Sequence, residues 1–457
     1  MPISWPPRRG AGRDIPARYD PALPRLKGPG PVRVLASARF VLPQPLAVRA
    51  GGTLNSGSHE RCPEAHRVLI LFLTAFFVMA GFSLLLPSIV FVLQNLGASP
   101  ALATPMLAAY SLAQFLFGPL WGGLSDRLGR KPVLLLCLGG SFGAYLFMSR
   151  VAADSLPLML LALAMAGAMA GSLAVLFAAA ADRTGVENRA RGMGLIGAAI
   201  GLAFVFGPAL GGYLAGESAD EASIIVPAFA SAAVSGLALM LVLVNFRESH
   251  SHAGTGLPVG RLKGLAIMTS RPLLARLGLM VLLFTVSLSL MEPSLPLLLE
   301  GRLGWGPREL GRLFTYVGLI MALMQGGVVP RIARRMGERP VARAGALMMG
   351  LGLAGLALAD GLASVLAAMT LVGLGVACFN PTMASLASHQ AGSGERGLVM
   401  GQFNAMQALG RSAGPLASGV LFQSADAMPF LVGAVLVLLV LVWQSVLFAR
   451  LARKAAT

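Results

Sequence analysis

The chain has 457 residues, of which 56% are hydrophobic and only 12% are charged, whereas about 25% are charged in a typical soluble domain. Because even a large soluble domain leaves about a quarter of its unfolded surface exposed, this much apolar surface indicates that the main solvent is lipid. Of the net charge of +17, +7 lies in residues 1–67 and the remaining +10 is spread over short loops rather than over one basic surface, and the three cysteines provide no disulfide framework. Soluble enzymes, secreted scaffolds, disordered regulators and nucleic-acid-binding proteins are therefore excluded.

Residues 1–67 differ in composition from the rest of the chain. They contain eleven Lys and Arg residues against four Asp and Glu residues, together with eleven of the 29 prolines. Arg33, Arg39 and two prolines interrupt the apolar stretch 32–48, so it is not a signal peptide. We predict a disordered, basic, Pro-rich cytoplasmic tail, although a start codon assigned too early would give the same composition.

Twelve apolar stretches follow from residue 68 onward. About 20 residues at 1.5 Å per residue cross a hydrocarbon core of roughly 30 Å, and most of the stretches have at least this length. The predicted spans are 68–94, 102–123, 132–152, 155–181, 192–215, 223–245, 272–299, 309–330, 341–360, 362–388, 397–423 and 427–449. The fold class is therefore an all-α membrane protein with about twelve transmembrane helices.

The basic residues predict how the helices are oriented. If the N-terminus is cytoplasmic, twenty Lys and Arg residues fall in inner loops and four in outer loops, with the tail left out. This positive-inside bias predicts that both termini are cytoplasmic. His250 and His252 lie in the long polar loop between helices 6 and 7, but two histidines without further ligands predict no metal site.

The two halves of the chain repeat each other. Gly207-Pro208 matches Gly414-Pro415 at an offset of 207 residues, and Leu86-Pro87 matches Leu295-Pro296 at 209. We therefore predict a duplicated protein with a substrate site between two pseudo-symmetric six-helix bundles. The predicted domains are the tail 1–67, an N-terminal bundle 68–246, a cytoplasmic linker 247–271 and a C-terminal bundle 272–457 with a short cytoplasmic tail.

The loop after the second span carries the most specific motif, Gly122-Gly123-Leu124-Ser125-Asp126-Arg127-Leu128-Gly129-Arg130-Lys131. It resembles the G-x-x-x-D-R-x-G-R-K signature of the major facilitator superfamily. The resemblance implies that Asp126 faces the start of helix 11 and that Arg130 pairs with Asp182, which together close the cytoplasmic side. The gating motif predicted here comprises Gly122, Asp126, Arg127, Gly129, Arg130 and Asp182.

A second motif, Gly207-Pro208-Ala209-Leu210-Gly211-Gly212, is similar to the antiporter motif of drug/proton antiporters in this superfamily. Gly207, Pro208, Gly211 and Gly212 can bend the helix and allow close packing, and generic helix packing explains them as well. The branch's usual glycine four residues before Gly207 is Ala203 here, its arginine in helix 4 is Leu163, and helix 1 lacks an acid. These departures put the branch's standard coupling site in doubt.

Two charged residues lie inside apolar spans, Glu292 in helix 7 and Arg411 in helix 11. Such charges are functional candidates, because a charge within the bilayer is unfavourable. Thr285 and Ser289 share the helical face of Glu292, and we expect this stripe to line a cavity. Glu292 is a titrating proton-coupling carboxyl, half of a fixed clamp with Arg411, or an interfacial residue. Arg411 either packs helices or contacts substrate.

Other polar residues in the spans are candidates for the substrate cavity, although each can also form an ordinary helix–helix hydrogen bond. They are Tyr110 and Gln114 in helix 2, Gln325 in helix 8, Asn380 in helix 10, and Asn404 and Gln407 in helix 11.

The function predicted from these features is secondary active transport by alternating access. Resemblance to the drug/proton antiporter branch implies proton-coupled multidrug efflux of small apolar or amphiphilic compounds, with the proton as coupling ion and no other cofactor. An importer or facilitator of a small metabolite is the alternative. A membrane enzyme or receptor would need a catalytic cluster or a ligand-binding domain, and neither is visible.

The expected partners are a small-molecule substrate and the lipid bilayer. The chain has no P-loop, so no nucleotide is expected, and no nucleic acid either. We expect a monomer in the bacterial cytoplasmic (inner) membrane.

Overall fold

A computed structural model describes residues 61–150, 154–183, 189–246, 248, 270–390 and 396–456. Most of the predicted tail and nearly all of the predicted linker, including His250 and His252, lie outside these residues. The described residues are helical almost throughout, as predicted.

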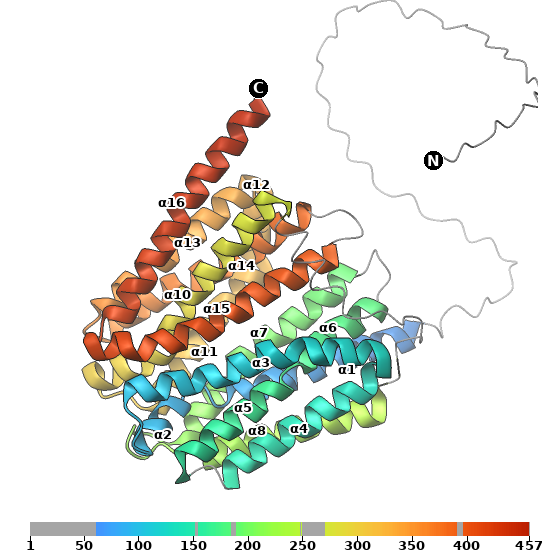
Figure 1. Cartoon of the computed structure of the whole chain (residues 1–457), viewed down its shortest axis with the longest axis vertical. Coiled ribbons are helices and arrows are strands. Elements are labelled where there is room, and N and C mark those ends of the chain that lie inside the picture. The colour runs from blue at the N-terminus through green and yellow to red at the C-terminus, as the bar shows by residue number, and fades with distance from the viewer. Residues whose placement is uncertain are drawn as a thin grey trace, which may run out of the picture. The chain divides into compact units, whose positions relative to one another are not determined.

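The described part of the first half forms eight helices, which carry blue to green colours in Figure 1. They are α1 (Arg61–Ser83), α2 (Ile89–Asn95), α3 (Pro100–Leu128), α4 (Arg130–Arg150), α5 (Leu156–Met169), α6 (Ser172–Arg183), α7 (Arg189–Ala215) and α8 (Ile225–Asn245).

The second half provides the yellow to red helices. They are α10 (Pro272–Leu303), α11 (Pro307–Leu323), the π-helix η2 (Met324–Val328), α12 (Val329–Met336), α13 (Glu338–Ala357), α14 (Leu362–His389), α15 (Arg396–Ser424) and α16 (Met428–Ala456).

Three predicted spans are interrupted. Span 68–94 breaks between α1 and α2 close to Pro87, which has no backbone N–H to donate. Span 155–181 breaks at Gly171, which packs against the ring of Trp121. Span 309–330 widens into η2 at Gly326 and Gly327, where low helix propensity favours such a bulge.

Ten helices of the described part of the chain are long and apolar enough to cross a membrane. The two other predicted spans correspond to α1 and α15. The apolar part of α1, Leu69–Ser83, is shorter than the ten spanning helices. Polar and charged residues, including Gln407 and Arg411, lower the hydropathy of α15. Large apolar side chains such as Leu120, Val244 and Leu358 are exposed, as expected for helices surrounded by lipid.

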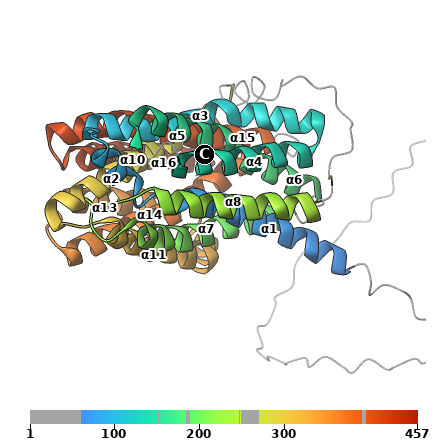
Figure 2. The same ribbon diagram turned by 90° about the horizontal axis from the view of Figure 1, so that it is seen from below.

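The contacts between the halves are concentrated in two helix pairs, α3 with α15 and α7 with α11. In Figure 1, α3 runs beside α15, and Figure 2 shows α7 and α11 together along the other side of the bundle. We refer to the two ends of this bundle as the Arg130 end and the Arg308 end, after the residues that lie there.

Small residues bring the helices of each half into backbone contact. In the first half a Cβ atom on Gly207 would meet Oγ of Ser83, and one on Gly414 in the second half would meet Oγ of Ser289. Ser83 donates to the carbonyl of Ala203 at 3.0 Å, and Ser289 donates to that of Gly410 at 2.8 Å. These contacts repeat at offsets of 206 and 207 residues, close to those of the sequence repeat, so α1–α7 and α10–α15 pack in the same way.

Gly211→Ala tests the packing of α7 on α1, because the added methyl group would collide with the backbone carbonyl of Leu84. We expect a loss of about 1–3 kcal/mol in stability, read from thermal unfolding in detergent. Gly201→Ala in the same helix is the matched control, since nothing lies within 4 Å of its Cβ position. Equal destabilisation by both variants would contradict the packing.

Candidate functional site

The structure brings together three of the predicted site residues, one from each of three helices. Glu292 on α10 has an exposed side chain although the residues on either side of it are buried. Arg411 on α15 is half-buried and interacts electrostatically both with Glu292 and with the buried Tyr110 on α3. Because α3 belongs to the first half and α15 to the second, this charged cluster lies at the contact between the halves.

Glu292 and Arg411 attract each other without direct ion-pair contact among the described residues. A carboxylate that holds no hydrogen-bonded partner is free to exchange a proton or to accept a donor from a ligand. This geometry disfavours the fixed clamp, which requires the two groups in contact.

The sequence did not reveal what holds Tyr110. Its hydroxyl group is hydrogen-bonded to that of Tyr145 on α4, and its ring stacks on Phe82 with 4.5 Å between centroids. The backbone of Tyr110 also lies against Gly167 on α5, where a Cβ atom would not fit. Tyr145 thus fixes the hydroxyl group that faces Arg411, although nothing in the sequence around it distinguishes it from other apolar-span residues.

The expectation that the stripe of Glu292 lines a cavity is wrong for Thr285 and Ser289. Both are buried in the contact between α10 and α15, where Gly410 packs on Thr285 and Ser289 donates to the Gly410 carbonyl. Hydroxyl groups and glycines at this spacing bring helices together as readily as they line a cavity, and helical periodicity alone does not separate the two uses.

The remaining predicted cavity residues form no hydrogen bond with this cluster among the described residues. Within the described residues, no hydrogen bond connects Gln114, Gln325, Asn380, Asn404 or Gln407 with one another or with Glu292. Gln325 lies exposed in η2, and the buried Oδ1 of Asn380 has no hydrogen-bond partner in the described part of the chain.

A second cluster surrounds Arg130, whose side chain is only 6% exposed. Its Nε donates to Asp182 at 2.9 Å, and its Nη1 lies 2.6 Å from both Asp126 and the Ser125 hydroxyl. Arg130 and Asp182, which the family resemblance pairs, are therefore in contact. The Asp126 carboxylate also binds Arg130. The contact that the resemblance implies between Asp126 and the start of helix 11 falls on a segment that includes residues 391–395, which lie outside the described part of the chain. Arg127 is exposed, and the Cβ position of Gly122 is open.

Glu248, just beyond α8, completes this cluster and was not foreseen from the sequence. Its carboxylate accepts the backbone N–H groups of Arg130 at 2.9 Å and Lys131 at 3.0 Å, which are the first residues of α4. An acid at this place satisfies orphan donors and the positive end of the helix dipole. Gly129, with φ of +100°, leaves the room that the Glu248 carboxylate occupies.

The second half carries an acid at the position that Arg130 occupies in the first half. Glu338 stands at the position equivalent to Arg130 and contacts Ser385 and, at 3.5 Å, His389 at the end of α14. The motif in this half has Arg334 in place of the first acid, so the sequence comparison detected the loss of that acid but not the contact of Glu338 with His389.

The antiporter motif on α7 lies between α1 of its own half and α11 of the other half. Gly211 packs on the backbone of Leu84 in α1, whereas Gly212 packs on Pro307 and Gly311 in α11, across the contact between the halves. The carbonyl of Pro208 lies against Gly311 in the same contact.

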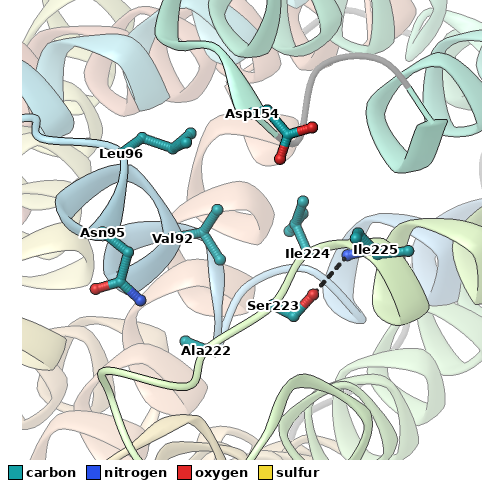
Figure 3. Close-up of a pocket in the computed structure, with 8 residues that line it drawn as sticks. All are labelled: Val92, Asn95, Leu96, Asp154, Ala222, Ser223, Ile224 and Ile225. Carbon is teal, nitrogen blue, oxygen red and sulfur yellow. Dashed lines mark hydrogen bonds between the residues drawn. The ribbon is translucent and has the colours of Figure 1, made fainter.

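A small pocket of about 150 Å³ lies elsewhere, at the Arg308 end of the first half. Figure 3 shows Asp154 on one side of it, facing Val92 and the Ser223–Ile225 segment, with Ser223 bonded to the backbone of Ile225. None of the predicted site residues lines this pocket, so it is separate from the charged cluster.

Two halves of apolar helices with charged residues at their contact define a membrane transporter. The sequence model of the Major Facilitator Superfamily matches residues 71–415 and 279–456. The chain therefore belongs to this superfamily. It is an integral membrane protein that carries a small-molecule substrate, and it is not an enzyme.

Within the family the chain is similar to several drug-resistance proteins. It is 31% identical over 372 residues to the class G tetracycline resistance protein of Vibrio anguillarum, covering 79% of this chain and 92% of that protein. It is 26% identical over 418 residues to human major facilitator superfamily domain-containing protein 10, covering 81% and 90%.

Solved structures share the fold. The crystal structure of the human organic anion transporter MFSD10 matches with a TM-score of 0.65 and 24% identity, covering 84% of this chain and 99% of that one. The nucleoside transporter NupG matches with a TM-score of 0.68 and 15% identity, covering 83% of this chain and 98% of that one.

Glu248→Ala tests the capping of α4. We expect a loss of about 1 kcal/mol and roughly fivefold faster amide exchange at Arg130 and Lys131, because both N–H groups lose their acceptor. Exchange of a peptide covering 129–136, read by mass spectrometry, measures this. Glu221→Ala, which removes an exposed acid at the opposite end, should leave that exchange unchanged. Unchanged exchange in Glu248→Ala would mean that the carboxylate does not cap the helix.

Proposed function

We propose that the protein exports small amphiphilic or apolar compounds in exchange for protons, with Glu292 as the residue that binds the proton. The observation that carries the proposal is the charged cluster of Glu292, Arg411 and Tyr110 at the contact between the halves. Relatives named as tetracycline resistance proteins, with about 30% identity over most of both chains, support export of drug-like compounds.

Exchange requires that proton and substrate exclude each other. When Glu292 is ionised, its charge balances that of Arg411, and a positively charged or hydrogen-bond-donating substrate can take the carboxylate as its partner. When Glu292 is protonated, the carboxylate is neutral and the charge of Arg411 is unbalanced, so a cation is repelled. One carboxyl group beside a fixed cation is thus sufficient to make proton binding and substrate binding mutually exclusive.

The same charges link the proton to the alternation of the halves. An unbalanced, half-buried guanidinium is stabilised by an acceptor, and the hydroxyl oxygen of Tyr110 is the acceptor that the first half offers near it. Protonation of Glu292 therefore strengthens a contact across the halves, with Tyr145 keeping Tyr110 in place. A proton bound by Glu292 in the second half thus changes the interaction of Arg411 with Tyr110 in the first half.

The Arg130 cluster provides the second component of the proposal. We infer that the Arg130 end is cytoplasmic, because the basic residues concentrate there. Asp126, Arg130 and Asp182 then form a gating element that holds α3, α4 and α6 together on that side. The proposed location is the bacterial inner membrane, with both termini cytoplasmic and the protein acting as a monomer.

Glu292→Gln tests the coupling. The substitution keeps the shape of the side chain but removes its titration, so we expect drug-driven collapse of a pH gradient in everted vesicles to fall at least about tenfold. Membrane insertion of the variant should stay normal. The test compounds are chosen by a panel screen, as those that the wild-type protein exports from cells lacking their own pumps. Drug-induced loss of the gradient, followed with a fluorescent pH probe, is the measurement.

Glu300→Gln is the matched control, because Glu300 lies on the same helix two turns closer to the Arg308 end. It should couple as the wild type does. If Glu292→Gln still exchanges protons normally, Glu292 is not the proton carrier. If wild-type vesicles take up a metabolite with the gradient instead of releasing the gradient on drug addition, the protein is an importer.

A further inference from the structure

The contact between the halves is closed at the Arg308 end by glycines from both halves. Gly212 of α7 and Gly311 of α11 face each other, with the Cβ position of each 3.0 and 3.1 Å from the other's Cα. Gly306 packs on the backbone of Glu217, and Gly419 of α15 packs on Pro100 at the start of α3. No side chain larger than hydrogen fits at these four positions.

At the Arg130 end the glycines of the same helices are uncovered. Nothing lies within 4 Å of the Cβ positions of Gly122 and Gly123 in α3, Gly201 in α7 and Gly401 in α15. The backbones of the two halves are therefore in contact at the Arg308 end, whereas none of these four glycines makes such a contact at the Arg130 end.

One ion pair crosses the closed end. Arg308, at the start of α11 in the second half, pairs with Glu217, which follows α7 in the first half. The guanidinium carbon of Arg308 also lies 5.1 Å from the ring centre of Tyr213 on α7. Both partners of Arg308 thus belong to the opposite half. The buried Nε of Arg308 has no hydrogen-bond partner in the described part of the chain.

We propose that Glu217, Arg308 and Tyr213 form a charged gate at the Arg308 end that must break each time this end opens. The argument is one of differential contact: an interaction shifts an equilibrium between two states only if it is present in one of them. Separation of α7 from α11 removes both partners of Arg308 at once. The proposal depends on alternating access alone and not on the identity of the substrate or of the coupling ion.

A nearby ion pair distinguishes this role from ordinary surface charge. Arg302 and Asp426 are 2.8 Å apart at the same end of the protein, but both belong to the second half. This pair moves as one body when the halves separate, so it is present in both states. Its loss should leave the equilibrium between the states unchanged.

The test is a distance measurement across the Arg308 end of the full-length protein in lipid nanodiscs. Spin labels at Ser99 in the first half and Ser364 in the second replace two exposed serines, in a background with the three native cysteines changed to alanine. Double electron–electron resonance then reports the populations with this end closed and open. Glu217→Gln is the main variant, because the Glu217 side chain is exposed and its backbone contact with Gly306 is retained.

We expect the open population to rise about three- to fivefold relative to the closed one in Glu217→Gln, the size that loss of an exposed ion pair allows. Glu217→Arg should raise it further by repulsion, and the exchanged pair Glu217→Arg with Arg308→Glu should restore most of the closed population. In wild-type protein, 1 M salt should shift the populations in the direction of Glu217→Gln. Asp426→Asn should behave as the wild type does.

Two results would overturn the proposal. One is an unchanged distance distribution in both Glu217→Gln and Glu217→Arg. The other is an equal shift in Glu217→Gln and Asp426→Asn, which would show a general effect of charge at this end.

Discussion

An ionised side chain inside an apolar bundle needs a partner of opposite charge or access to water, and this constraint explains the placement of the internal charges. Arg130 satisfies it completely, with two carboxylates and a serine around a buried guanidinium. Arg411 satisfies it incompletely, because Glu292 balances its charge without touching it. The complete cluster is suited to hold helices in place, and the incomplete one is suited to respond when a proton or a ligand arrives.

The close contacts between backbones set where the halves can touch. The antiporter motif shows this most clearly, because Gly211 serves the packing of α7 within its own half and the adjacent Gly212 serves the contact with α11. Two adjacent glycines therefore link the inside of one half to the surface of the other. The charged residues at the Arg308 end lie directly beside this contact, whereas the Glu292 cluster lies further along α10 and α15. Opening this end and titrating Glu292 are thus changes at separate places in one contact.

Hydropathy and spacing were sufficient to predict the helices, since lipid requires long apolar segments whose backbone bonds are internal. Glu292, Arg411 and Tyr110 could be proposed as a group because charge and polarity are rare in such segments. Tyr145 and Glu248 could not, because their roles depend on partners that the fold brings together, 35 residues from Tyr110 in one case and 118 from Arg130 in the other. The serine stripe on α10 was misread for a related reason: the same small polar residues serve packing and cavities alike. The Glu217–Arg308 pair was missed because charges at the ends of helices and in loops carry no periodic signal.

The central claim is that one carboxyl, Glu292, holds either a proton or the substrate but not both. Calorimetric titration of purified protein with an exported compound, in buffers of different ionisation enthalpy, counts the protons released per molecule bound. The account predicts release of up to one proton by the wild type over the pH range in which binding depends on pH, and none by Glu292→Gln. Binding by wild-type protein with no proton released at any pH would contradict it.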